Sequence, residues 1–349
     1  MFPASLVSGN PHPAFGPPSL GDQAPMQIRI TQVPIMQDTV TQFPVTQVPV
    51  TQVPVMQVPI MQGVPVGAPK GLRMPTPQRR PDSTTFAMVV SRLRAAGCVF
   101  AEDEALLLLS ESSTPAELSE WVDCRVTGMP LEYILGWAEF CGLRIDVDPG
   151  VFVPRRRTAL LVSEAADLLR HGLTTPPVPR PGVVVDLCCG SGAVGVAIAS
   201  RVPGVELHAA DIDPVAVCCA RQNVGRVGGQ VHGGDLYRAL PVSLRGRVQL
   251  LAVNAPYVPT EALRTMPSEA RNYEPRVSLD GGLDGLELHR RVVEDAAEWL
   301  APGGHLLIET SALQGAGTAA LMADAGFVVR TVRSEDLDAT AVVGSRRAA

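Results

Sequence analysis

Four consecutive residues, Asn254, Ala255, Pro256 and Tyr257, combine a side-chain amide, a rigid turn and an aromatic ring. They follow the apolar run 248–253, which is typical of a buried strand, and ligands bind at the carboxyl ends of strands in open α/β sheets. The Asn254 side-chain oxygen and the Ala255 carbonyl can each accept one N–H of an amide or an exocyclic amine. The Tyr257 ring can cover the flat face of such a group. These four are therefore the candidate catalytic residues, although Asn-x-Pro also occurs in ordinary turns.

A glycine-bearing turn about sixty residues earlier indicates a cofactor site. The β-branched run 183–187 leads into Cys188–Gly192, and 193–199 then follows a helical pattern. Gly190 and Gly192 allow the backbone to approach a ligand closely. Asp211 ends the next predicted strand, where an acidic residue is placed to bind ribose hydroxyls. Cys188 replaces the first glycine of a dinucleotide fingerprint, so the sequence favours a nucleoside cofactor without phosphates over NAD.

Taken together, residues 186–192, Asp211 and 254–257 resemble class I S-adenosylmethionine-dependent methyltransferases. More narrowly, the chain resembles the HemK/PrmC family of protein N(5)-glutamine methyltransferases, which methylate the glutamine of the Gly-Gly-Gln tripeptide in peptide-chain release factors. The stretches 130–155 and 273–286 carry this narrower resemblance, because they match the family's interdomain linker and the loop after its catalytic residues. The resemblance runs from about residue 85 to the C-terminus.

The resemblance implies S-adenosyl-L-methionine as the cofactor, a release factor as the protein partner, and no metal. It places Asp235 and Leu236 beside the adenine. Glu309 and Gln314 also match a family stretch, and the alternative for these two is that they do no more than tie loops together. The residues expected to bind the cofactor are Asp186, Cys188, Cys189, Gly190, Ser191, Gly192, Asp211, Asp235, Leu236 and Asn254.

The sequence departs from the family pattern at three places. Ala255 stands where the family usually has proline, which keeps the backbone acceptor but loosens the turn. Cys188 and Cys189 replace a glycine and a small hydroxyl residue, and 156–159 reads Arg-Arg-Thr-Ala in place of Pro-Glu-Thr-Glu. These departures predict a divergent subgroup that keeps the cofactor chemistry and leaves the identity of the protein substrate open.

The predicted fold class is α/β, a Rossmann-like seven-stranded class I methyltransferase sheet whose last two strands form an antiparallel pair. The methyltransferase domain is expected at 159–349, after a small helical substrate-recognition domain at 83–128 and a linker with a β-hairpin at 129–158. The predicted strands are 183–187, 205–211, 230–234, 248–253, 304–309, 327–333 and 340–345.

Residues 1–82 differ from the rest in composition. Units such as 46–50 and 51–55 repeat Thr-Gln-Val-Pro-Val, and a proline at every fifth position opposes both helix and sheet. We expect a disordered, polyproline-like tail. It is either sequence translated upstream of the true start, which we favour, or a docking tail.

The formal net charge of −6 disfavours a nucleic-acid backbone as the main partner. Seven cysteines without a C-x-x-C pair give no zinc pattern, and no apolar run reaches membrane-spanning length. We therefore expect a cytoplasmic monomer that acts on protein, without membrane attachment. The alternatives are an exocyclic-amine methyltransferase acting on adenine in DNA or RNA, which would use the same hydrogen-bond geometry, and a non-catalytic cofactor-binding scaffold.

Overall fold

The computed structural model describes residues 82–172 and 182–348, with only the backbone described at 171 and 172. The predicted tail lies outside the described residues, except for Asp82. The Asp82 carboxylate accepts a hydrogen bond from the Thr85 backbone N–H at 3.0 Å and so caps the first helix.

Four helices begin the described chain: α1 (Ser83–Ala95), α2 (Ala101–Glu111), α3 (Pro115–Val126) and the short α4 (Leu131–Leu135). Helix α3 begins where Pro115 predicts it, because proline fits the first helical position and the Thr114 hydroxyl accepts from the Glu117 N–H at 3.1 Å. The helices share a small apolar core that includes Leu93, Leu108 and Val122.

A hairpin then connects the helices to the main sheet. Strands β1 (Trp137–Phe140) and β2 (Leu143–Asp146) are antiparallel, and their turn holds Cys141 and Gly142 at positive φ. Residues 147–155 and a 3₁₀ turn (Arg156–Thr158) lead into α5 (Ala159–Gly172).

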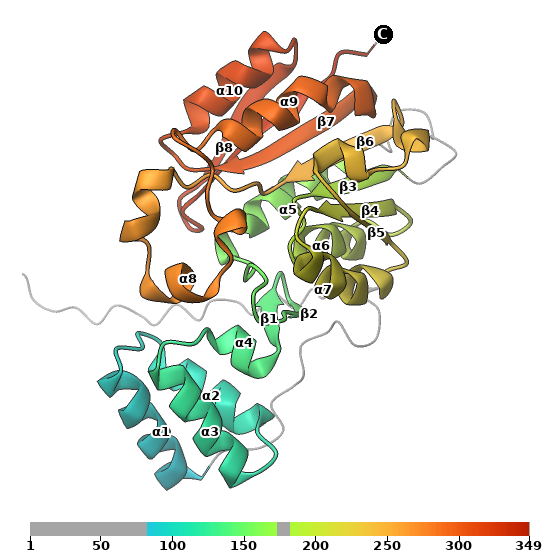
Figure 1. Cartoon of the computed structure of the whole chain (residues 1–349). Coiled ribbons are helices and arrows are strands. Elements are labelled where there is room, and N and C mark those ends of the chain that lie inside the picture. The colour runs from blue at the N-terminus through green and yellow to red at the C-terminus, as the bar shows by residue number, and fades with distance from the viewer. Residues whose placement is uncertain (1–81, 173–181, 349) are drawn as a thin grey trace, which may run out of the picture. The chain divides into compact units, whose positions relative to one another are not determined.

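The main sheet has seven strands in the order β5-β4-β3-β6-β7-β9-β8 (Figure 1). Its neighbours are parallel except around β9, which is antiparallel to both β7 and β8. The predicted fold class and antiparallel pair are therefore confirmed. The strands are β3 (Val183–Leu187), β4 (Glu206–Asp211), β5 (Gln230–Gly233), β6 (Val248–Val253), β7 (Leu300–Thr310), β8 (Val328–Ser334) and β9 (Ala339–Ser345).

Helices cover both faces of the sheet, because successive strand residues point to opposite sides. Val184 belongs to an apolar cluster that includes residues of α5, α6 (Ala193–Arg201) and α7 (Pro214–Gly225), whereas Val185 belongs to a cluster on the other face that includes residues of α9 (Glu287–Trp299) and α10 (Gly315–Asp324). Both faces of the central strands are thus buried, which explains their nearly continuous apolar runs.

Strand β7 differs from its prediction, because it begins at Leu300 rather than at residue 304. Leu300 pairs with Val248, whereas His305 pairs with Leu250, so an irregularity in the ladder accommodates the intervening residues. The Pro-Gly-Gly sequence at 302–304 is typical of a turn, so the sequence did not predict that the strand extends back to Leu300.

None of the helices within 82–172 and 182–348 is long and apolar enough to cross a bilayer. The same residues contain no group of three or more His, Cys, Asp or Glu side chains arranged to hold a metal ion.

Candidate active site

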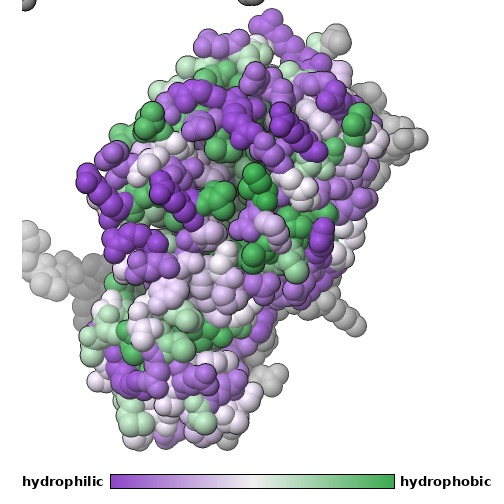
Figure 2. All heavy atoms as spheres, viewed as in Figure 1, coloured by the Kyte–Doolittle hydropathy of each residue, from purple (hydrophilic) through white to green (hydrophobic). Residues whose placement is uncertain are grey.

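A cleft of about 970 Å³ lies at the carboxyl ends of β3, β4 and β6. Apolar side chains gather around a hollow near the centre of the face shown in Figure 2. All but one of the predicted site residues line the cleft. These are Asp186, Cys188, Cys189, Gly190, Ser191, Asp211, Asp235, Leu236, Asn254, Ala255, Pro256 and Tyr257.

Gly192 is the predicted residue that does not line the cleft. It begins α6 at φ 77°, and a Cβ there would lie 2.7 Å from a Val224 methyl carbon. The absence of a Cβ therefore lets the helix start close to α7, and a direct contact of Gly192 with the cofactor stays a prediction.

Asp186 holds the glycine turn against α6. Its Oδ2 accepts a hydrogen bond from the Gly195 N–H at 2.8 Å, and the side chain is almost completely buried. Burial raises the pKa of Asp186 to about 8, although the Gly195 hydrogen bond acts in the opposite direction. Asp186 thus shapes the floor of the cleft, and a Cβ at Gly195 would lie 3.1 Å from the Asp186 Cβ.

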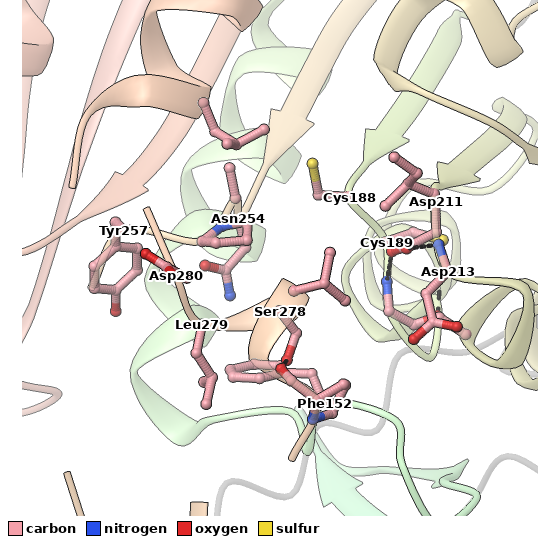
Figure 3. Close-up of a pocket in the computed structure, with 18 of the residues that line it drawn as sticks. Phe152, Cys188, Cys189, Asp211, Asp213, Asn254, Tyr257, Ser278, Leu279 and Asp280 are labelled. Atoms are coloured by element: carbon pink, nitrogen blue, oxygen red, sulfur yellow. Dashed lines mark hydrogen bonds between the residues drawn. The ribbon is translucent and has the colours of Figure 1, made fainter. Parts of the chain in front are cut away.

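Asp211 binds the other side of the same turn. Figure 3 shows its carboxylate beside Cys189, and its Oδ2 accepts from the Gly190 N–H at 2.8 Å while Oδ1 accepts from the Asp213 N–H at 2.9 Å. Each oxygen keeps a second lone pair for a ligand hydroxyl. Burial raises the pKa of Asp211, because the charged form loses hydration in the cleft.

Asp235 lies at the far end of the cleft, and its Oδ2 is 2.6 Å from an Arg291 nitrogen. Sequence reasoning missed Arg291, because nothing in the spacing of β5 and α9 shows that the two side chains meet. The next residue, Leu236, has φ 47°, so the backbone turns sharply at the place where the resemblance predicts that the adenine ring of the cofactor binds.

The four candidate catalytic residues all line the cleft, and Figure 3 shows Asn254 and Tyr257 on the opposite side of it from Asp211. The Asn254 Nδ2 donates to the Thr158 hydroxyl at 3.3 Å. Within the described part of the chain, neither the Asn254 Oδ1 nor the Ala255 carbonyl has a donor. The cleft therefore contains two hydrogen-bond acceptors without donors and the Tyr257 ring, and their role in binding a substrate stays a prediction.

The loop 279–286 supports these residues through backbone contacts. The Gly281 N–H donates to the Val258 carbonyl at 2.8 Å, and the Gln314 side chain donates to the Tyr257 carbonyl at 2.8 Å and the Asp284 carbonyl at 3.0 Å. A Cβ on Gly285 would lie 2.3 Å from the Tyr257 carbonyl oxygen. Gln314 therefore ties two loops together, because it connects the loop 279–286 to the turn formed by residues 254–257.

Cys188 adopts φ 58°, in the left-handed region that suits glycine. We expect Cys188→Gly to be more stable than Cys188→Ala by about 1 kcal/mol, because alanine retains the left-handed strain. Chemical denaturation of both variants measures the difference. Cys218, which is exposed in α7, is the matched control: there alanine should be more stable than glycine by about 1 kcal/mol. The same order at both positions would contradict strain at Cys188.

The chain is similar in sequence to known methyltransferases. The Methyltransferase small domain family matches residues 142–266. A release factor glutamine methyltransferase from Geobacter sulfurreducens is 36% identical over 219 residues, which cover 62% of this chain and 73% of that protein. A 4-amino-L-phenylalanine/4-methylamino-L-phenylalanine methyltransferase from Streptomyces pristinaespiralis is 37% identical over 216 residues, which cover 61% of this chain and 71% of that protein.

Among solved structures, a release factor-specific protein-(glutamine-N5) methyltransferase from Alicyclobacillus acidocaldarius is 25% identical, with a TM-score of 0.35 over 58% of this chain and 99% of that one. Most of the curated relatives with the strongest matches are named release factor glutamine methyltransferase. The chain belongs to the release factor glutamine methyltransferase family.

Proposed function

We propose that this enzyme transfers a methyl group from S-adenosyl-L-methionine to the side-chain amide nitrogen of a glutamine in a peptide-chain release factor. The observation that carries the proposal is the pair of unoccupied acceptors, Asn254 Oδ1 and the Ala255 carbonyl, in one cleft with the glycine turn. An amide NH₂ group presents two N–H donors to such a pair.

The residues of the glycine turn fit the cofactor. Gly190 has φ 54°, and a Cβ there would have only the Phe152 Cβ within 4 Å, at 3.9 Å, so the backbone borders open space. Asp211 and Asp213 provide carboxylates that suit ribose hydroxyls and a cationic ligand. When bound, S-adenosyl-L-methionine supplies an electrophilic methyl group on a sulfonium.

The chain's own residues act by orienting a poor nucleophile. An amide nitrogen donates its lone pair to its carbonyl group and therefore attacks weakly. Hydrogen bonds from its two N–H groups to Asn254 and Ala255 would hold it in line and stabilise the positive charge that develops on nitrogen. The Tyr257 ring, which is mostly buried, would cover one face of the amide and exclude water.

The protein substrate is supported by the names of the relatives and by the acidic character of the chain. The net charge of −6 argues against the DNA or RNA alternative, because phosphate backbones favour basic surfaces. We propose that the enzyme acts in the cytoplasm, where release factors function, and as a monomer.

A small aromatic amine with a carboxylate is the second candidate acceptor. The Streptomyces pristinaespiralis relative is as similar as the release factor enzymes, and its name includes 4-amino-L-phenylalanine. Arg157 lines the cleft and is half exposed, where the family pattern has a glutamate. A guanidinium at this place favours binding of a substrate carboxylate.

One labelling experiment separates the candidates. The full chain is incubated with methyl-labelled S-adenosyl-L-methionine and a release factor from the same source, the same factor with its Gly-Gly-Gln glutamine changed to alanine, or 4-amino-L-phenylalanine. Label on the first protein alone supports glutamine methylation. Label on the amino acid alone supports the second candidate, and label on none of the three contradicts both.

A further inference from the structure

A buried asparagine on α7, Asn223, connects two walls of the cleft without lining the cleft itself. Its side chain is 0% exposed. The Nδ2 donates to the Ser191 carbonyl in the glycine turn at 2.9 Å and to the Asp146 carbonyl at 2.9 Å. The Oδ1 accepts from the Asp146 N–H at 2.9 Å. One side-chain amide therefore bonds both the glycine turn and the last residue of β2.

The linker that starts after Asp146 forms the wall opposite the glycine turn. A Cβ built on Gly190 would have the Phe152 Cβ as its nearest neighbour, at 3.9 Å, so the turn and the linker face each other there. Five residues of the linker line the cleft: Gly150, Val151, Phe152, Pro154 and Arg155. The point at which Asp146 is held thus determines where the linker passes the glycine turn.

Asparagine suits this place because its amide has one acceptor oxygen and two N–H donors on a short side chain. Both hydrogens are used, one on each carbonyl, and the oxygen also accepts from the Arg226 Nη1 at 3.3 Å. Glutamine carries the same groups one methylene further from the backbone, which a fully buried site cannot accommodate without movement. A carboxylate would face two carbonyl oxygens without a hydrogen to donate.

We propose that Asn223 is a positioning residue that holds the linker at a fixed separation from the glycine turn and thereby sets the affinity for S-adenosyl-L-methionine. The two Nδ2 hydrogen bonds act together, because each carbonyl belongs to a different wall. Without them, Ser191 and Asp146 would each lose a buried donor, and the two walls would separate to find other partners. The inference rests on the cofactor part of the proposed function and is independent of which acceptor is methylated.

Binding of S-adenosyl-L-homocysteine to the full-length chain, followed by calorimetry, measures this effect without turnover. Asn223→Ala should raise the dissociation constant by roughly tenfold or more, because it removes both bonds between the walls. Cys219→Ala is the matched control on the same helix. Cys219 is also completely buried and its Sγ donates to the Asp146 carbonyl at 3.2 Å, but within the described residues it has no hydrogen bond to the glycine turn. This control should keep the dissociation constant within about twofold.

Asn223→Asp separates the need for donors from the need for shape, because it keeps the size of the side chain and removes both N–H groups. The charged groups that face this position are the Arg226 guanidinium and the Asp146 carboxylate, which pair with each other. At about pH 8 the ionised variant should bind roughly tenfold more weakly than wild type. At about pH 5.5 a neutral carboxyl regains one hydrogen for one carbonyl, so the ratio of the two dissociation constants should fall at least about threefold.

Two results would overturn the proposal. Wild-type affinity in Asn223→Asp at high pH would show that the shape of the side chain is sufficient. Affinity losses in Asn223→Ala and Cys219→Ala that are proportional to their losses of stability in urea would show that the side chain only supports the fold. If Asn223→Ala does not fold, the pH comparison of Asn223→Asp with wild type decides alone. No methyl acceptor is present, so failure to label a release factor leaves these measurements decisive.

Discussion

Asn254→Ala is expected to lower kcat about 10²–10³-fold, equivalent to roughly 2.7–4 kcal/mol, by analogy with the loss of one preorganised hydrogen-bond partner of a reacting group. The variant removes the Asn254 side chain, which is the side-chain member of the acceptor pair that we propose binds the substrate amide. Single-turnover kinetics with labelled cofactor measure the chemical step directly, without a contribution from product release.

Binding of the cofactor separates this effect from damage to the cleft. The Asn254 side chain meets Thr158, while the glycine turn is held by Asp186 and Asp211, so calorimetry should show the dissociation constant of S-adenosyl-L-methionine within a fewfold of wild type. Asn272→Ala, at an exposed position of the short helix α8 (Ser268–Tyr273), is the matched control and should retain full activity. Undiminished turnover in Asn254→Ala would remove this residue from the mechanism.

Gly285→Ala should be the most damaging single-methyl change near the site. Gly285 has φ 72°, and the added Cβ would lie 2.1 Å from the Gln314 Nε2 and 2.3 Å from the Tyr257 carbonyl oxygen. The left-handed conformation costs about 1–2 kcal/mol, and overpacking adds roughly 1–3 kcal/mol. The loop must also separate from the catalytic turn, and a displacement of about 1 Å can cost 10²-fold in rate.

Gly246→Ala isolates the backbone contribution to this loss. Gly246 has φ 68°, and nothing lies within 4 Å of a Cβ built on it, so this variant experiences the left-handed strain without a clash. The difference in free energy of unfolding between the two variants, from urea denaturation, gives the steric part. Equal stability and full activity in both would contradict the contact between loop 279–286 and Tyr257.

The strands were predictable because their apolar runs end in residues that cannot continue a buried strand. The turn 254–257 and the glycine turn follow β6 and β3 directly, and parallel strands bring their carboxyl ends to one edge, so the sequence indicated the edge of the sheet at which both turns lie. The structure shows in addition that β3 and β6 are neighbours and that both turns line one cleft. Pro115 and Thr114 likewise gave the start of α3.

The side-chain partners of the site were not predictable in the same way. Thr158 is separated from Asn254 by 96 residues, and Arg291 from Asp235 by 56. No periodicity links residues on different elements at such separations, and these contacts depend on how the helices pack against the sheet. The hydrogen bond between Asp186 and Gly195 and the close approach of Gly192 to Val224 were not predictable for the same reason, because a sequence shows that a turn is tight without showing what it packs against.

Ala255 is buried among apolar residues and lines the cleft, and the group that we propose as its contribution to the site is its backbone carbonyl. Every amino acid has this carbonyl, so the choice of residue at 255 is a matter of protein stability and is invisible to the substrate. Two neighbouring positions of one motif therefore meet different requirements: the proposed chemistry needs the Asn254 side chain, whereas the side chain at position 255 only has to fit the core. A survey that treats loss of the proline as loss of function would misclassify enzymes such as this one as inactive.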